Sequence, residues 1–166
     1  FLKSKLKEAI SMTQKKLSTW LRLVTIILFF TGIFFFVGLT VLILLNQPKN
    51  VFHLKSEIFF LWSCVFPCYG VLFQFWKITN QISCENSFSM ENAHSFMVMT
   101  KFGIAMFIIF FIRLFYGIFM EEFYFYRICY ALLMLIISLV FSILCFALSK
   151  LVAHAYEVKQ ETEYTI

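Results

Sequence analysis

Charged residues are scarce in this sequence. Aspartate is absent, so that all acidic residues are glutamates, and charged residues make up only 14% of the 166-residue chain. A soluble domain carries about 25% charged residues. Hydrophobic residues account for 61% of this chain, including 24 phenylalanines. This balance excludes an ordinary soluble domain, because a core of this size has no room for so many apolar side chains.

The motifs of common enzymes are also missing. The sequence has no glycine-rich phosphate loop, no G-x-S-x-G elbow and no H-E-x-x-H zinc motif. His53, His94 and His154 lie far apart and lack the spacing of metal ligands. We therefore predict a protein that is not an enzyme and that holds no cofactor and no metal ion.

Four long apolar runs fill most of the chain, and polar stretches separate them. Each run is close to the roughly 20 apolar residues that a helix needs to cross about 30 Å of hydrocarbon. We predict an all-α, polytopic membrane protein: a single membrane domain over residues 1–166 with four transmembrane helices in a bundle. The predicted spans are 23–45, 58–76, 96–118 and 127–149. The first run is too long for the core of a cleaved signal peptide.

The segment 1–22 is basic and amphipathic. Its lysines avoid one helical face, on which residues recur at steps of three and four: Leu2, Leu6, Ile10, Thr13, Leu17 and Trp20. This pattern is typical of a helix that lies in the plane of the lipid headgroups with its apolar face down. A simple extension of the first span fits the segment equally well, and both interpretations stay open.

The distribution of lysine and arginine predicts the orientation in the membrane. Basic residues accumulate on the cytoplasmic side of membrane proteins. The opposite orientation would leave only Lys49, Lys55 and Arg127 in the cytoplasm. We therefore expect a multi-pass protein of the cell membrane whose two termini and tail, 150–166, are cytoplasmic. Its basic residues then face the anionic inner leaflet, and no direct nucleic-acid binding is expected.

Two cations fall inside the third predicted span. Lys101 lies near the cytoplasmic end, where its long side chain can reach the headgroups. Arg113 lies deeper, and a charge within the membrane is a candidate functional residue. Its alternatives are to reach outward to the surface or to pair with Glu121 or Glu122. No acidic residue lies within the predicted spans, which argues against a proton-coupled exporter.

Two helical faces carry small or polar residues and are predicted to point into the bundle, because small residues let helices approach closely in lipid. These helix-packing residues are Ser63, Pro67, Gly70 and Gln74 in the second span, and Ser138, Ser142, Cys145 and Ser149 in the fourth. Cys64 and Cys68 are spaced C-x3-C rather than as the redox C-x2-C, so packing is the favoured interpretation.

The loop before the third span and the end of the chain carry two short motifs. Phe88-Ser89-Met90-Glu91-Asn92 resembles the P-F-S-x-E-N motif of a bacterial four-helix integral membrane family of unknown function. The tail Glu161-Thr162-Glu163-Tyr164-Thr165-Ile166 resembles the family ending E-N-D-L-T-I. The chain departs from the family at Ser87, Thr162 and Glu163. Ser89 and Glu91 also have a local interpretation, as the cap and the first-turn acid of the third helix.

The resemblance implies a partner. Members of this family are often encoded beside a small helix-turn-helix regulator, which suggests a membrane protein that binds a cytoplasmic DNA-binding protein or another membrane protein. The candidate interaction residues are Phe88, Ser89, Glu91, Asn92, Glu161, Glu163, Tyr164 and Ile166. An exposed acidic tail is suited to a basic partner.

We therefore expect a non-enzymatic interaction protein that regulates or sequesters a cytoplasmic partner. One alternative is an immunity protein against a membrane-active bacteriocin or toxin. A second is a small transporter or a subunit of an intramembrane enzyme, with Arg113 at its centre.

Overall fold

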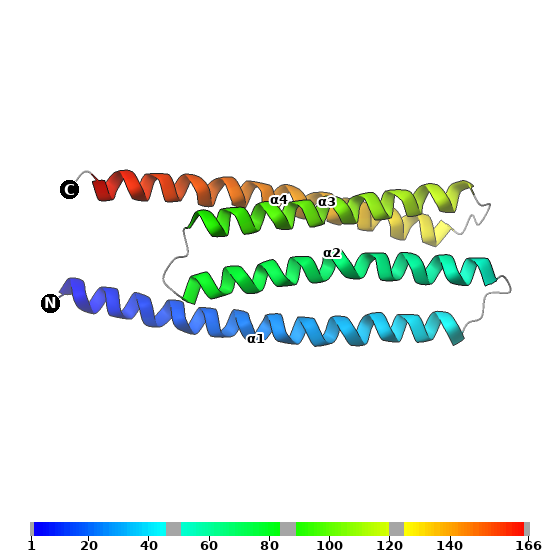
Figure 1. The fold of residues 1–166 in the computed structure, drawn as a ribbon, viewed down its shortest axis with the longest axis horizontal. Helices are drawn as coiled ribbons and strands as arrows, with labels where there is room; N and C mark the ends of the chain where they lie inside the picture. The colour runs from blue at the N-terminus through cyan, green and yellow to red at the C-terminus, as the bar shows by residue number, and fades with distance from the viewer. Residues whose placement is uncertain (1, 46–50, 84–88, 120–124, 165–166) are drawn as a thin grey trace.

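The computed structural model describes residues 2–45, 51–83, 89–119 and 125–164, and it contains four helices (Figure 1). These are α1 (Leu2–Leu45), α2 (Val51–Ser83), α3 (Met90–Phe119) and α4 (Phe125–Tyr164). Each helix is long and apolar enough to cross a membrane. The prediction of an all-α protein with four membrane-spanning helices is confirmed, and these helices are those of a multipass membrane protein.

The helices pack in chain order, each against the next, and consecutive helices run antiparallel (Figure 1). Within the described ranges, no Cα of α1 comes within 8 Å of a Cα of α3 or α4, and α2 and α4 are likewise separated. The bundle is therefore open along one side, between α1 and α4, which we call the open seam. Both termini lie at the same end of the molecule, which we call the terminal end.

At the terminal end, α1 extends well beyond α2. The hydroxyl of Ser18 donates a hydrogen bond to the backbone oxygen of Thr79 at 3.1 Å, and Arg22 donates to Ser83 Oγ at 3.0 Å. Because α2 ends at Ser83, four residues after Thr79, residues 2–13 of α1 lie beyond the end of α2. At a rise of about 1.5 Å per residue these residues cover about 18 Å.

The last helix, α4, extends in the same direction. The Ser149 hydroxyl donates to the backbone oxygen of Ala93 at 2.7 Å, and α3 begins three residues earlier, at Met90. Residues 153–164 of α4 therefore lie beyond the start of α3, and they cover about 18 Å. Figure 1 shows both helices reaching past α2 and α3 at this end.

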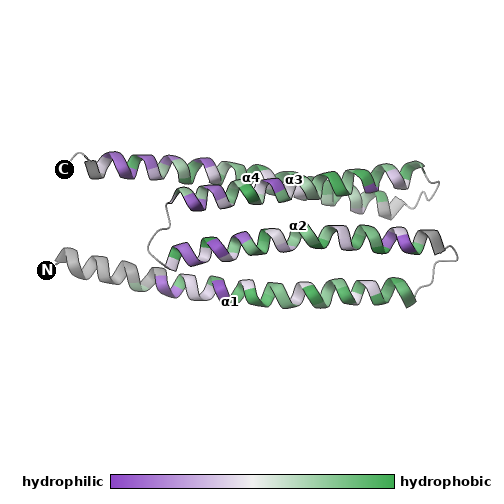
Figure 2. Cartoon of the chain, viewed as in Figure 1, coloured by the Kyte–Doolittle hydropathy of each residue, from purple (hydrophilic) through white to green (hydrophobic). Residues whose placement is uncertain are grey.

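All four helices are longer than the predicted spans. The segment 2–22 is continuous with the first span in a single helix, as the second of the two sequence interpretations has it, and the tail is helical as far as Tyr164. Hydropathy marks only the part of a helix that is apolar, whereas backbone hydrogen bonding carries a helix on into the headgroups and water. Figure 2 shows this division, with apolar residues along the middle of the helices and hydrophilic residues gathered toward the terminal end.

The contact between α3 and α4 is built on small residues. A Cβ atom added to Gly103 would lie only 2.3 Å from Ser142 Oγ, so the two helices approach each other as closely as glycine allows. The predicted face of the fourth span is buried along its whole length at this contact: Ser138, Ser142, Cys145 and Ser149. Close backbone approach of this kind drives helix association in lipid.

The predicted face of the second span lies toward α3. Pro67 is fully buried, and a Cβ on Gly70 would lie 2.5 Å from the ring of Phe102. Ser63 and Gln74 are half-buried, and the Ser63 hydroxyl donates to the backbone oxygen of Phe59 at 2.8 Å within its own helix. The face thus packs closely at Pro67 and Gly70, whereas Ser63 and Gln74 stay partly exposed.

Candidate functional site

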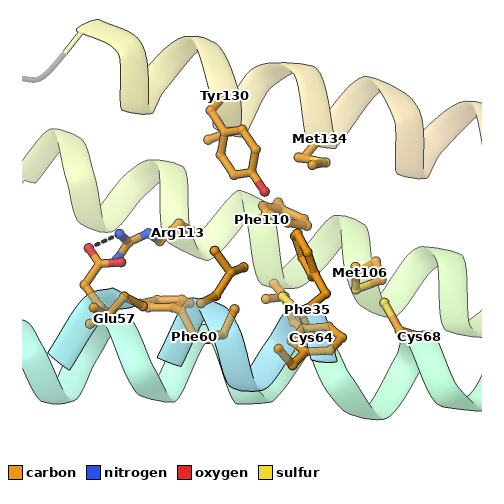
Figure 3. A pocket seen from close by; sticks show the side chains of 16 residues that line it. Phe35, Glu57, Phe60, Cys64, Cys68, Met106, Phe110, Arg113, Tyr130 and Met134 are labelled. Atoms are coloured by element: carbon orange, nitrogen blue, oxygen red, sulfur yellow. Dashed lines mark hydrogen bonds and ion pairs between the residues drawn. The ribbon is translucent and has the colours of Figure 1, made fainter. Parts of the chain in front are cut away.

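A cavity of about 380 Å³ lies among the four helices, in the half of the bundle away from the terminal end (Figure 3). This volume lies within the range of about 300–1,000 Å³ that is usual for small-molecule sites. Its wall is mainly aromatic, aliphatic and sulfur-containing, with contributions from all four helices, and includes Phe35, Cys64, Cys68, Phe110, Tyr130 and Met134. Such a lining is suited to an apolar ligand.

One ion pair lies at an end of this cavity. Arg113 of α3 donates through Nη2 to the Oε1 atom of Glu57 on α2. The guanidinium also lies over the ring of Phe60, 4.9 Å from its centroid. The side chains of Arg113 and Glu57 are only 22% and 27% exposed. Because their surroundings are apolar, each charge depends on the other for compensation.

The partner of Arg113 differs from the one expected from the sequence. Glu121 and Glu122 lie outside the described residues, and the carboxylate that meets Arg113 belongs to Glu57. No acidic residue lies within the predicted spans, but the apolar helix of the structure that could cross a membrane covers Leu54–Ser83 and so includes Glu57. The predicted span began at residue 58 because the preceding polar residues lower the local hydropathy. Pairing with Arg113 offsets the cost of placing the carboxylate there.

A signal for this pair exists in the sequence. In an antiparallel helical hairpin, residues at similar distances from the connecting loop lie at the same level. Glu57 and Arg113 are nearly equidistant from the segment 84–88, which joins α2 to α3. Opposite charges at matching positions in two consecutive helices therefore indicate an ion pair between them.

The sulfur atoms and the remaining polar groups line the deeper part of the cavity. Cys64 and Cys68 are free thiols on α2. Tyr130 reaches from α4 toward α3 and meets the ring of Phe110 edge to face, with 6.3 Å between the centroids (Figure 3). Among the described residues, no group of three or more histidine, cysteine or acidic side chains is arranged to hold a metal ion. Binding of an apolar molecule is the chemistry that this arrangement favours.

The inner-loop motif has a structural role at the start of α3. Ser89 Oγ accepts a hydrogen bond from the backbone N–H of Asn92 at 3.2 Å, which is the geometry of a helix N-cap. The amide of Gln81 on α2 donates to the carboxylate of Glu91. These contacts cap α3 and hold it to the end of α2, so that the motif fixes the corner between the two helices.

This placement changes the interpretation of the candidate interaction residues. Asn92 is only 1% exposed, which leaves it no surface for a partner and corrects its assignment as a contact residue. Glu91 and Glu161 are exposed. Ser89 is half-buried, and the remaining four candidates fall outside what the structure describes: Phe88 and Ile166 altogether, and Glu163 and Tyr164 in their side chains. Lys101 is exposed on α3, away from the cavity.

Comparison with known proteins identifies a family whose function is unknown. A family model described as "Protein of unknown function (DUF2975)" matches residues 55–166, a stretch that includes Glu57, Arg113 and the inner-loop motif. No curated protein and no solved structure matches the chain. Since the family model covers most of the sequence, from the first turns of α2 to the last residue, the chain belongs to the DUF2975 family.

Proposed function

We propose that this chain is a non-enzymatic membrane protein that regulates or sequesters a cytoplasmic partner at its terminal end. The observation that carries the proposal is the extension of α1 and α4 beyond α2 and α3. We refer to residues 2–13 of α1 and 153–164 of α4 as the terminal extensions. Neither is needed to cross the membrane, and both extend from the same end of the bundle.

The lengths of these helices support a role outside the bilayer. The 44 residues of α1 and the 40 residues of α4 correspond to about 66 and 60 Å of helix. The hydrocarbon core is about 30 Å thick, and the headgroups bring the bilayer to about 40–45 Å. The excess at the terminal end therefore stands in water or among headgroups, where a protein partner can reach it.

The charges of the α4 extension favour a basic partner. Glu157 is largely exposed, with a distant contact of 3.8 Å to His154, and Glu161 is also exposed. A small helix-turn-helix regulator, the partner that the family resemblance implies, carries a basic surface for DNA phosphates. Carboxylates on the extension compete with those phosphates for the same surface. Binding at the membrane then withdraws the regulator from DNA.

The orientation of the chain is part of this proposal. The lysine-rich start of α1 favours placing the terminal end in the cytoplasm. The two extensions then differ in charge: the α1 extension is basic and suited to anionic headgroups, whereas the α4 extension is acidic and suited to the partner. The capped corner at Ser89 contributes indirectly, because it holds the start of α3 against Ser149 at the base of the α4 extension.

A capture experiment tests the proposal. The full-length chain, tagged and solubilised from membranes, is used to capture a co-expressed small helix-turn-helix regulator of the kind that the family resemblance implies. Deleting the residues after Lys159, or changing Glu157→Gln together with Glu161→Gln, is expected to lower capture at least fivefold. The matched control is Lys159→Gln, which removes a charge of the opposite sign from the same extension. Unchanged capture by the two acidic variants would contradict the proposal.

A further inference from the structure

We propose that the cavity binds a single apolar chain that ends in an anionic group, with the anion at Arg113 and the chain directed toward the middle of the membrane. This inference concerns the opposite end of the bundle from the terminal extensions and is independent of partner binding. Its evidence comes from the length of the cavity, its access from the membrane and the donors at its charged end.

The length of the cavity matches the depth of one leaflet. Along α2, its lining runs from Glu57 to Cys68, which corresponds to about 16 Å of helix. Half of the hydrocarbon core is about 15 Å deep. Glu57 lies near the beginning of α2, whereas Cys68 lies close to the middle of the helix. The ion pair is therefore at the membrane surface and the sulfur-lined part near the bilayer centre, which is how a lipid of that leaflet is oriented.

The open seam gives such a molecule access from the side. Two cavity residues, Phe35 on α1 and Tyr130 on α4, are 60% and 53% exposed. They lie on the two helices that border the seam, and no described Cα of α1 comes within 8 Å of one of α4. A chain can thus enter from the surrounding lipid without passing through water.

The donors at the ion pair select the sign of the headgroup. A guanidinium carries five N–H donors in a planar fork and can bind two carboxylates at once. The contact with Glu57 engages Nη2, and the face of the group rests on Phe60. Glu57 makes other interactions besides this one. An anion can therefore join Arg113 beside Glu57, whereas a cation would have to displace Arg113 from Glu57.

Two kinds of molecule present an apolar chain with an anionic end: a free fatty acid, and an anionic phospholipid that inserts one of its chains. The cavity is at the small end of the range for ligand sites, which favours a single-chain molecule. We therefore use palmitic acid that carries a diazirine at mid-chain as the probe. The full-length protein is held in nanodiscs of phosphatidylcholine, labelled by light and mapped by mass spectrometry. Labels are expected on cavity residues, Cys64, Met106 and Met134 among them.

Two variants of the ion pair separate binding from folding. Arg113→Gln removes the anion's partner and is expected to lower labelling about tenfold, the usual loss for one charge-assisted contact. Glu57→Gln releases the guanidinium from its own carboxylate and is expected to raise labelling severalfold. Both variants break the same pair, so a folding defect alone would lower labelling in both. Lys101→Gln, which removes an exposed cation of α3 outside the cavity, is expected to change nothing.

Competitors and a cavity-filling variant complete the test. Unlabelled palmitate should compete, and hexadecanol, which has the same chain without the charge, should compete at least tenfold less well. Competition by phosphatidylglycerol as strong as by palmitate would assign the site to phospholipid and still support the proposal. Met134→Trp, which fills the cavity and leaves the ion pair in place, should lower labelling at least fivefold. Equal competition by the alcohol, unchanged labelling of Arg113→Gln, or labelling lowered in Glu57→Gln as much as in Arg113→Gln, would overturn the proposal.

Discussion

Single polar residues stabilise this protein through specific ion-pair and hydrogen-bond partners. Arg113 and Glu57 lie on different helices and are mostly buried, so that each loses an opposite charge in largely apolar surroundings when the other is removed. Ser89 has a comparable role at the terminal end, where its hydroxyl satisfies a backbone N–H that the first turn of α3 leaves unpaired. The ion pair thus links two helices, whereas the Ser89 hydroxyl stabilises the start of its own helix.

The ion pair leads to a prediction at this scale. Glu57→Leu or Arg113→Leu alone is expected to destabilise the fold by about 2 kcal/mol, because a partly buried charge loses its partner. The double variant Glu57→Leu with Arg113→Leu should recover most of that loss, since no unpaired charge remains. Unfolding in mixed micelles with increasing sodium dodecyl sulfate measures all three. Additive losses in the double variant would show that the two side chains do not interact.

The helix cap gives a second prediction. Ser89→Ala should destabilise the corner between α2 and α3 by about 1 kcal/mol, because the N–H of Asn92 loses its acceptor. Ser89→Asp keeps an acceptor at the positive end of the helix and should be close to neutral. The same unfolding titration measures both variants. A loss of the same size with aspartate would mean that capping is not the reason for serine at this position.

Whole helices are held together by close approach at a few glycines. The contact of α3 with α4 depends on Gly103 and a row of small residues, and the contact of α2 with α3 places Gly70 against an aromatic ring. Many apolar side chains elsewhere are exposed, and among the described residues α1 comes within 8 Å, Cα to Cα, of α2 alone and is mostly exposed. In lipid such exposure has no hydrophobic cost, so packing density decides which faces meet.

Alanine substitutions at two glycines, Gly103 and Gly38, test the packing between helices and provide its control. Gly103→Ala should weaken the contact between α3 and α4 by about 1–3 kcal/mol, because the new Cβ overlaps Ser142. Gly38→Ala is the control: a Cβ there meets nothing within 4 Å, and alanine is the better helix former. The unfolding titration compares them. Equal effects of the two substitutions would contradict the close approach at Gly103.

The molecule as a whole has two different ends. The terminal end carries the long extensions, and hydrophilic residues gather toward it (Figures 1 and 2). The other half holds the cavity and the ion pair. An open seam runs between the first and last helices. We expect the terminal end to bind a protein in water and the cavity to bind an apolar chain from the membrane.

Orientation is tested on the whole molecule. In a variant without the native cysteines Cys64, Cys68, Cys84, Cys129 and Cys145, single cysteines are placed at Gln160 and at Lys55. A membrane-impermeant maleimide should label Lys55→Cys in intact cells and Gln160→Cys only in inside-out vesicles, because the lysine-rich start of α1 favours the inner leaflet. The reverse pattern of labelling would place the termini outside.

The amino-acid sequence by itself determined the membrane environment, the number of helices and the small-residue faces. Those features follow from local hydropathy and from helical periodicity, which each segment carries on its own. Only the tertiary structure decided that Glu57 is the partner of Arg113, that Asn92 is buried and that the four helices enclose a cavity. These depend on how far each helix continues beyond its apolar run and on the register between neighbours. Both are set by contacts between residues distant in sequence, which no local pattern encodes.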